Sequence, residues 1–293
     1  MFAPEFDYYR ASSIAEASEL LRKNPGAKLL AGGHSLIPLL KLRLASPSAV
    51  VDIGRIPDLR GISVDGDLIR IGALTTHAEL SASPELLERC PILAEAAEQI
   101  GDPCVRNRGT IGGNVAHADP ASDLPTVLTA LQAAFVVSGP AGTRRVNAAE
   151  FFQGMMATAV GEHDVLTSIE ITAHPGNQGT AYVKFSHPAS RYAVIGVAAI
   201  VTVGNGVCTS ASVAIGGLVP KPVRATAVER AIIGHPLSLE AIAKAAPLVD
   251  SDLGRDVLGD VYASAEYRRA VAPIWVKRAL TAAAGRLEAT FKI

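Results

Sequence analysis

Cysteine is scarce in this 293-residue sequence, which holds only Cys90, Cys104 and Cys208. They lie far apart, and none has the paired spacing typical of metal-binding or redox-active cysteines. Three thiolates are also too few for an ordinary iron–sulfur cluster, which takes four ligands. We therefore expect reduced, buried thiols. If the protein transfers electrons, its redox centre is expected to be an organic cofactor.

The sequence also lacks an excess of charge of either sign, since its formal net charge is -1. Nucleic-acid binding normally requires a basic face, so no nucleic-acid partner is expected. No apolar run is long enough to cross a bilayer. The N-terminus carries Glu5 early and has neither the basic nor the apolar region of a secretory signal. These absences predict a cytoplasmic protein.

Hydrophobic residues are abundant at 49%, whereas charged residues make up 19% of the chain. This balance predicts a large buried core and excludes wholesale disorder. The length suits two domains, or one domain with subdomains.

The first part of the chain alternates predicted helices and strands. A capping box at Ser13 begins a helix that Pro25-Gly26 ends. A buried strand over 27–31, a short helix over 36–42 and a strand over 49–53 follow. This order resembles a nucleotide-binding βαβ unit, but the GxGxxG fingerprint is absent, so a Rossmann fold is only weakly indicated.

The remaining elements change in character near a predicted linker over 174–179. Before it we expect a hairpin over 62–71, helices over 76–81, 92–100 and 124–133, and strands over 135–137 and 166–171. After it we expect a long hairpin over 193–215 and helices over 225–233, 239–245 and 265–287.

Two glycine-rich segments are the most informative motifs, Ala31-Gly32-Gly33-His34-Ser35 and Thr110-Ile111-Gly112-Gly113-Asn114. Glycine pairs permit positive φ and let backbone amides converge on a ligand, which favours anionic groups such as phosphate. Two such segments suggest one long diphosphate ligand held from two sides. The alternative is that each pair only permits a tight turn.

The second glycine segment lies in a stretch over 101–125 that shows little regular periodicity. We expect a long ordered loop there, and such loops usually serve function. Ser122 and Asp123 either cap the next helix or accept hydrogen bonds from ligand hydroxyls. His117 and Asp119 lack a third matching ligand for a metal. A serine hydrolase is not indicated, because GxSxG is absent.

The segments AGGHSL at 31–36 and RNRGTIGGNVAHADPASDLP at 106–125 carry a family resemblance. With the stretches at 164–171, 182–185 and 264–268, they resemble the FAD-binding medium subunits of molybdenum hydroxylases, the xanthine dehydrogenase family. The carbon monoxide dehydrogenase medium subunits are the most similar in length and wording. The resemblance covers essentially the whole chain.

The resemblance implies an α+β fold in two domains. Residues 1–175 would form a two-subdomain FAD-binding domain of the vanillyl-alcohol oxidase type, with subdomains over about 1–55 and 56–175. Residues 176–293 would form a small α+β domain with an antiparallel sheet and helices.

The resemblance also implies that both glycine segments bind FAD along its diphosphate and ribityl chain. Tyr192 matches a tyrosine that packs on the flavin ring; the alternative is an ordinary tyrosine at the start of a strand. The cofactor-binding residues expected in this way are Ala31, Gly32, Gly33, His34, Ser35, Leu36, Thr110, Ile111, Gly112, Gly113, Asn114, Ser122, Asp123, Leu166, Lys184 and Tyr192. No catalytic residue and no metal ligand is expected on this chain.

The resemblance implies a role in electron transfer within a larger oxidoreductase. A large partner subunit would oxidise substrate at a molybdenum cofactor, and a small partner subunit would carry [2Fe-2S] clusters that reduce FAD on this chain. A dimer of heterotrimers is expected, at most attached to the inner face of the membrane through partners. The features of NAD-reducing relatives are not clearly present, so a quinone or another carrier is as plausible an acceptor as NAD.

Two alternatives stay open on the sequence alone. A free-standing flavin oxidoreductase would need its own acid–base groups, for which His77, His117 and His187 are available. A non-catalytic scaffold subunit would have a vestigial nucleotide site, which the retention of both glycine segments disfavours. The pocket for the organic substrate of the whole complex is expected on another chain.

Overall fold

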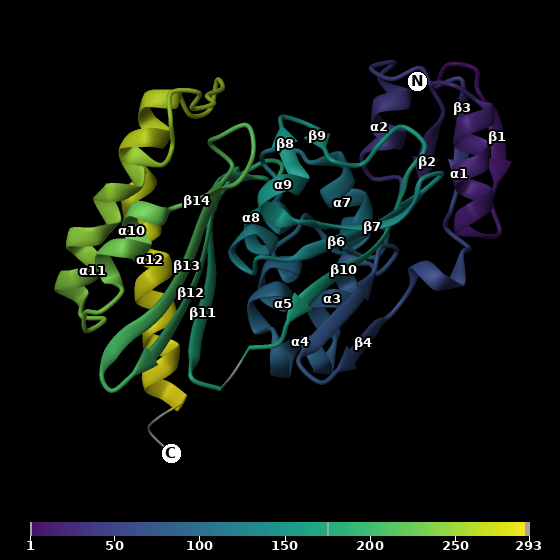
Figure 1. The fold of residues 1–293 in the computed structure, drawn as a ribbon. Helices are drawn as coiled ribbons and strands as arrows, with labels where there is room; N and C mark the ends of the chain where they lie inside the picture. The colour runs from purple at the N-terminus through teal and green to yellow at the C-terminus, as the bar shows by residue number, and fades with distance from the viewer. Residues whose placement is uncertain (1, 175, 291–293) are drawn as a thin grey trace.

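Three main sheets with their helices make up an α+β chain in the computed structural model, which describes residues 2–174 and 176–290. Figure 1 shows the three-stranded sheet at the N-terminal end, the five-stranded sheet in the middle and the four-stranded sheet towards the C-terminus. The fold class expected from the sequence is confirmed.

The three-stranded sheet is parallel, with strands in the order β1 (Asp7–Arg10), β3 (Ala49–Asp52) and β2 (Lys28–Leu30). Helix α1 (Ile14–Lys23) begins at Ser13, whose side chain accepts from the Glu16 amide as expected. The Glu16 carboxylate, however, bonds the Ser12 amide, so the reciprocal half of the box is shifted by one residue. Strand β2 is half-buried or exposed, which corrects the expectation of a buried strand.

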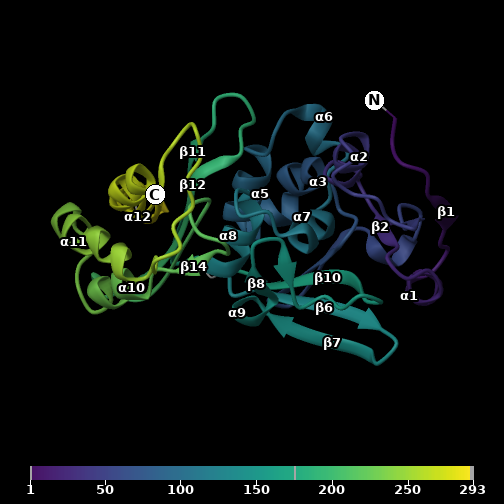
Figure 2. The same cartoon turned by 90° about the horizontal axis from the view of Figure 1, so that it is seen from above.

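The five-stranded sheet is antiparallel, in the order β4-β5-β10-β6-β7. Its strands are β4 (Ile62–Asp65), β5 (Leu68–Gly72), β10 (Val165–Thr172), β6 (Ala134–Gly139) and β7 (Gly142–Asn147). Alternate apolar residues pack one face against helices α3 (His77–Ala82), α5 (Pro91–Glu98) and α8 (Asp123–Ala130). Figure 2 shows those helices on one side of β10, β6 and β7. The opposite face carries polar residues such as Ser168 and Glu170.

The stretch over 101–125 is not the long loop that its sequence suggested. It contains α6 (Pro103–Arg106) and α7 (Ile111–His117) before α8 begins at Asp123. These helices are too short to show a clear apolar periodicity, and glycine disfavours a helix interior, so the pattern was misleading. The second glycine segment is therefore the first turn of α7.

Short elements fill the remaining connections of this part of the chain. They are η1 (Pro57–Leu59), α2 (Leu36–Lys41), α4 (Pro84–Arg89), α9 (Ala148–Phe151), β8 (Phe152–Gly154) and β9 (Ala157–Thr158).

The four-stranded antiparallel sheet has the order β11 (Gln178–Ser186), β12 (Ala193–Gly204), β13 (Val207–Gly216) and β14 (Val223–Arg224). Its helices are α10 (Thr226–Ile232), α11 (Leu239–Ala245), η2 (Ala246–Ser251) and α12 (Ala265–Thr290). Helix α12 packs along one face of this sheet, and α8 packs against the other face (Figure 1). The sheet is thus a layer between its own helices and the middle part of the chain.

Cys90 and Cys208 are buried thiols, as expected, whereas Cys104 is exposed, which corrects that expectation for one residue. It lies on the short helix α6, which leaves one side open to solvent. No helix in the described part of the chain combines the length and the apolar character that crossing a bilayer requires.

Candidate functional site

A cavity of about 580 Å³ lies where the N-terminal sheet, helix α7 and the loop between β11 and β12 meet. Its volume falls in the range of about 300–1,000 Å³ typical of small-molecule sites. All the expected cofactor-binding residues line it except Ile111 and Lys184. Ile111 is fully buried in the core, because its position in α7 turns its side chain away from the cavity.

The first glycine segment connects β2 to α2 along one wall of the cavity. Gly33 has φ +78°, a conformation that favours glycine, and a Cβ on Gly32 would lie 1.9 Å from the carbonyl oxygen of Arg108. Among the described residues, none accepts a hydrogen bond from the amides of residues 32 to 36. These amides are therefore available to an anionic ligand.

The second glycine segment uses most of its amides within the protein. The amides of Ile111 and Gly112 donate to the backbone carbonyls of Thr75 and Ala73, respectively. The Gly113 amide donates to the Thr110 hydroxyl, which caps α7. The expectation that both segments offer converging amides is thus supported only for the first. Helix α7 instead contributes the Asn114 side chain to the cavity lining. Its Nδ2 donates to the Ser122 hydroxyl, whereas its buried Oδ1 has no partner in the described structure.

The two glycine segments lie side by side, as the sequence analysis requires. A Cβ built on Gly113 would be 3.8 Å from Cβ of Ala31, and Gly32 packs on the backbone of residues 108 and 109. Both segments line the same cavity. A single extended ligand can therefore contact both.

His77 is a cavity residue to which the sequence assigned no cofactor role. It is 3% exposed, and its buried Nδ1 has no partner in the described part of the chain. Burial, followed by the charges of His34 and Arg106, lowers the pKa of His77 from 6.5 to about 4. The side chain is therefore neutral at pH 7. The Thr76 capping box, which fixes the start of α3, was the available sequence signal for its position.

Asp123 anchors the cavity wall to the C-terminal sheet. Its Oδ1 accepts from the Tyr182 hydroxyl at 2.6 Å and lies 3.0 Å from Lys184 Nζ, which also donates to the Gln99 carbonyl at 2.8 Å. Burial raises the pKa of the Asp123 carboxyl, while Lys184 and then Tyr182 act in the opposite direction. Lys184 therefore reaches the site through Asp123 and does not line the cavity.

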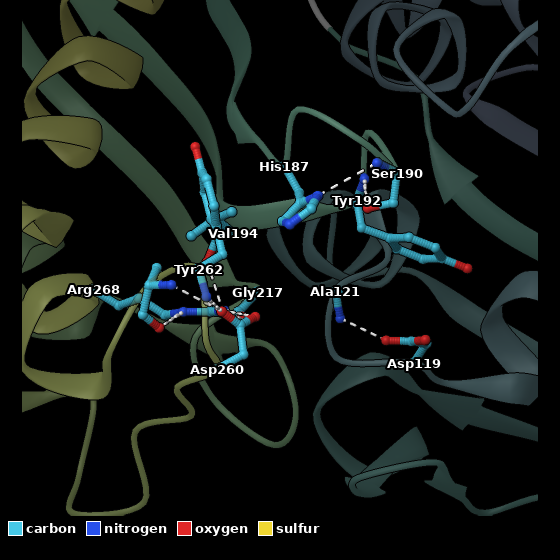
Figure 3. Close-up of polar contacts among 11 residues, drawn as sticks. Asp119, Ala121, His187, Ser190, Tyr192, Val194, Gly217, Asp260, Tyr262 and Arg268 are labelled. Carbon is cyan, nitrogen blue, oxygen red and sulfur yellow. Dashed lines mark hydrogen bonds and ion pairs between the residues drawn. The ribbon is translucent and has the colours of Figure 1, made fainter.

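The loop between β11 and β12 brings Ser190, Arg191 and Tyr192 to the cavity. Arg191 has φ +61° and its guanidinium donates to the Gly101 carbonyl at 2.9 Å, which fastens the loop across the cavity edge. Figure 3 shows the Tyr192 ring pointing away from Tyr262 and towards the segment that carries Asp119. Tyr192 is 44% exposed, so one side of the ring is open.

Arg268 supports this arrangement from a distance, a role that the sequence did not reveal. Its buried guanidinium donates to the carbonyl of Gly217 at 2.9 Å and to that of Val194 at 3.4 Å (Figure 3). Gly217 in turn donates to the Pro120 carbonyl at 3.0 Å. Arg268 thus ties the start of β12, just after Tyr192, to the turn that follows β13.

These features fit FAD at the level of the donor and acceptor groups present. The unpaired amides of residues 32 to 36 suit a diphosphate, and the orphaned Asn114 Oδ1 suits a ligand hydroxyl. The half-exposed Tyr192 ring offers a stacking surface. The contacts of individual residues with FAD remain predictions.

Two family models cover most of the chain. Residues 4–173 match the FAD binding domain in molybdopterin dehydrogenase, and residues 180–283 match the CO dehydrogenase flavoprotein C-terminal domain.

Individual relatives match along nearly their whole length. The carbon monoxide dehydrogenase medium chain of Hydrogenophaga pseudoflava is 39% identical over 98% of this chain and 99% of its own. The 6-hydroxypseudooxynicotine dehydrogenase complex subunit alpha of Paenarthrobacter nicotinovorans is 38% identical over 99% and 98%.

A solved structure agrees with these matches. Carbon monoxide dehydrogenase from Hydrogenophaga pseudoflava, which lacks the Mo-pyranopterin moiety of its molybdenum cofactor, superposes with a TM-score of 0.94 at 41% identity. The match covers 98% of this chain and 99% of the other. The chain therefore belongs to the family of FAD-binding medium subunits of molybdopterin dehydrogenases.

Proposed function

We propose that this chain relays electrons from [2Fe-2S] clusters on a small partner subunit to an external acceptor such as a quinone. Substrate would be oxidised at a molybdenum cofactor on a large partner subunit, within a dimer of heterotrimers. The observation that carries the proposal is the single cavity bordered by both glycine segments, in a chain that matches the medium-subunit family from end to end.

Different residues of the cavity would contact different parts of FAD. The amides of residues 32 to 36 would bind the diphosphate, while Thr110, Asn114 and Ser122 would contact the ribityl hydroxyls. Asp123, Leu166 and Tyr192 would surround the flavin ring. When bound, FAD supplies reversible one- and two-electron chemistry.

The protein's own contribution is to position groups and to set local charge. The Asp123 carboxylate is fixed by two donors and does not need to reorient, and Leu166 presents an apolar surface with only 5% exposure. His77 stays neutral because of its burial, so it can donate or accept without adding charge. No group here is required to exchange protons with the organic substrate.

We also propose the division at residues 175/176 as the domain boundary, with subdomains over about 1–55 and 56–175. The separate three-, five- and four-stranded sheets support this division. The cytoplasmic location and the quinone-type acceptor stay predictions.

The first test is flavin loading of the purified full chain. After addition of FAD and removal of the excess, the chain or its complex with the two partners is expected to carry equimolar flavin. Absence of flavin from both would overturn the proposal. A flavin-loaded chain that turns over a substrate without partners would instead favour the free-standing oxidoreductase.

The second test asks whether electrons reach the acceptor through this chain. A partner complex without this chain is expected to accept electrons from substrate at its metal centres and to stop there. Adding the flavin-loaded chain is expected to restore reduction of an added quinone. Equal quinone reduction with and without the chain would show that electrons leave by another route.

A further inference from the structure

A second cavity, of about 360 Å³, lies on the polar face of the five-stranded sheet, next to the first residue of α1. Within the described part of the chain it shares no lining residue with the larger cavity. Ile14 borders it on one side, and β4 and the segment before it border another. Its volume is sufficient for a small molecule.

The wall of this cavity is rich in hydroxyl groups. Ser63, Ser138, Thr143, Thr167 and Ser168 all line it. The Thr143 hydroxyl donates to Ser138 at 3.3 Å. The Ser168 hydroxyl is buried and, within the described residues, has no partner, although buried hydroxyls are generally hydrogen-bonded.

Positive charge also faces this cavity. Arg60 and Arg70 line it. Arg60 forms no ion pair with any described residue, although its Nη2 donates to the Gly54 carbonyl at 2.7 Å. Arg70 shares its partner, since Glu170 Oε1 lies 2.7 Å from Arg70 and Glu170 Oε2 lies 2.9 Å from Arg145. One carboxylate thus compensates two guanidinium groups. Asp58 is the acidic residue of the lining.

We propose that this second cavity binds a small phosphorylated metabolite that also carries hydroxyl groups. Guanidinium groups of Arg60 and Arg70 would hold the phosphate, whose three terminal oxygens and double charge exceed what a carboxylate offers. The serine and threonine hydroxyls would bind the body of the ligand, and Asp58 would accept from a ligand hydroxyl. This site is independent of the FAD site.

The test is calorimetric titration of the flavin-loaded full chain at constant ionic strength. The probes are inorganic phosphate and glycerol 3-phosphate, and saturable binding is expected with glycerol 3-phosphate the tighter of the two. Equal affinity for both would reassign the cavity to inorganic phosphate and overturn the assignment of a metabolite. Absence of saturable binding of either probe would overturn the site itself.

Matched variants separate a site from a general charge effect. Arg70 and Arg145 both bind Glu170 and are similarly exposed, at 53% and 58%, but only Arg70 lines the cavity. Arg70→Gln is expected to weaken glycerol 3-phosphate binding by about tenfold, and Ser168→Ala by a few-fold. Arg145→Gln is expected to have a clearly smaller effect, because Arg145 reaches the cavity only through the Glu170 that it shares with Arg70.

Flavin absorption provides the independent control. It is expected to be the same in all three variants, since none of these residues lines the FAD cavity. Equal losses of glycerol 3-phosphate binding in Arg70→Gln and Arg145→Gln, or no loss in Ser168→Ala, would refute the proposal even if FAD binding is normal.

Discussion

The hydroxyl group of Tyr182 donates to Asp123 Oδ1 over 2.6 Å, so a fully buried side chain of β11 holds a carboxylate at the start of α8. Lys184, two residues further along the same strand, lies 3.0 Å from the same oxygen. Residues two positions apart in β11 point to the same face of the sheet, because side chains alternate along a strand. The cavity wall is therefore assembled from both domains.

Tyr182→Phe tests the hydroxyl alone. It is expected to destabilise the chain by about 1.5–3 kcal/mol, because a hydrogen bond to a buried carboxylate is lost. Urea unfolding measures the change, and Tyr192→Phe is the control, since the Tyr192 hydroxyl has no partner among the described residues. Equal effects of the two changes would contradict the assigned role.

Lys184→Met is expected to have a larger effect, about 3–5 kcal/mol, because it leaves the buried Asp123 without its ion-pair partner. The double variant Asp123→Asn with Lys184→Met should recover part of that loss, since no charge is then stranded. Denaturant unfolding of both single variants and the double variant gives the coupling energy. Strictly additive losses would mean that the two groups do not interact.

Gly113→Val is expected to reduce FAD affinity by more than about tenfold, equivalent to about 1.4 kcal/mol. Its side chain would stand at the cavity, and its Cβ would lie 2.9 Å from Oγ1 of Thr110, the residue that caps α7. Fluorescence titration with FAD measures this. A Cβ on Gly112 would instead lie 2.5 Å from Cβ of Ala73, so Gly112→Ala should lower the unfolding midpoint. Unchanged FAD affinity in Gly113→Val would refute the placement of the ligand.

Gly33→Val is also expected to prevent FAD uptake, in part because it would distort the backbone of the first glycine segment. Its φ of +78° disfavours any side chain, and a Cβ would lie 2.6 Å from Cδ1 of Ile37. Circular dichroism must therefore accompany the flavin measurement. Normal flavin occupancy would contradict the role of the first glycine segment.

His77 should make the flavin-free chain sensitive to acid. Its folded pKa of about 4 lies below the ordinary 6.5, so the unfolded chain binds the proton more readily between these values. Stability from this group is complete above pH 6.5 and is lost as the pH falls towards 4, by up to about 3 kcal/mol.

The comparison that isolates this effect is urea unfolding across that pH range for the wild-type chain and His77→Gln. The variant is expected to lose less stability on acidification, whereas His235→Gln, at an exposed histidine, should behave like wild type. Parallel pH profiles for wild type and His77→Gln would show that His77 is not the buried titrating group.

Local patterns predicted the elements that carry their own signals. Helix α11 has the expected bounds, 239–245, and the β12–β13 hairpin follows its glycine turn. Strand β1 was missed because its four residues are mostly exposed and depend on pairing with β3. Such pairing joins distant residues and leaves no local signal.

The glycine motifs predicted where the candidate site lies, but the packing of the chain changed the roles of some of its residues. Both glycine segments do border one cavity, but the helical form of the second places Ile111 in the core and commits its amides to protein acceptors. The roles of Tyr182, His77 and Arg268 depend on contacts between segments far apart in sequence. Composition and spacing carry no information about those contacts.

Since β11 supplies both donors to Asp123, the two halves of this protein are not interchangeable modules. A chimaera that joins residues 1–175 to the C-terminal half of a distant relative would work only if that half brings a tyrosine and a lysine in the same register. Truncation before β11 would leave the buried Asp123 carboxylate without both of its donors and would remove one wall of the larger cavity. Protein engineers who graft such subunits need to move that strand together with the FAD domain.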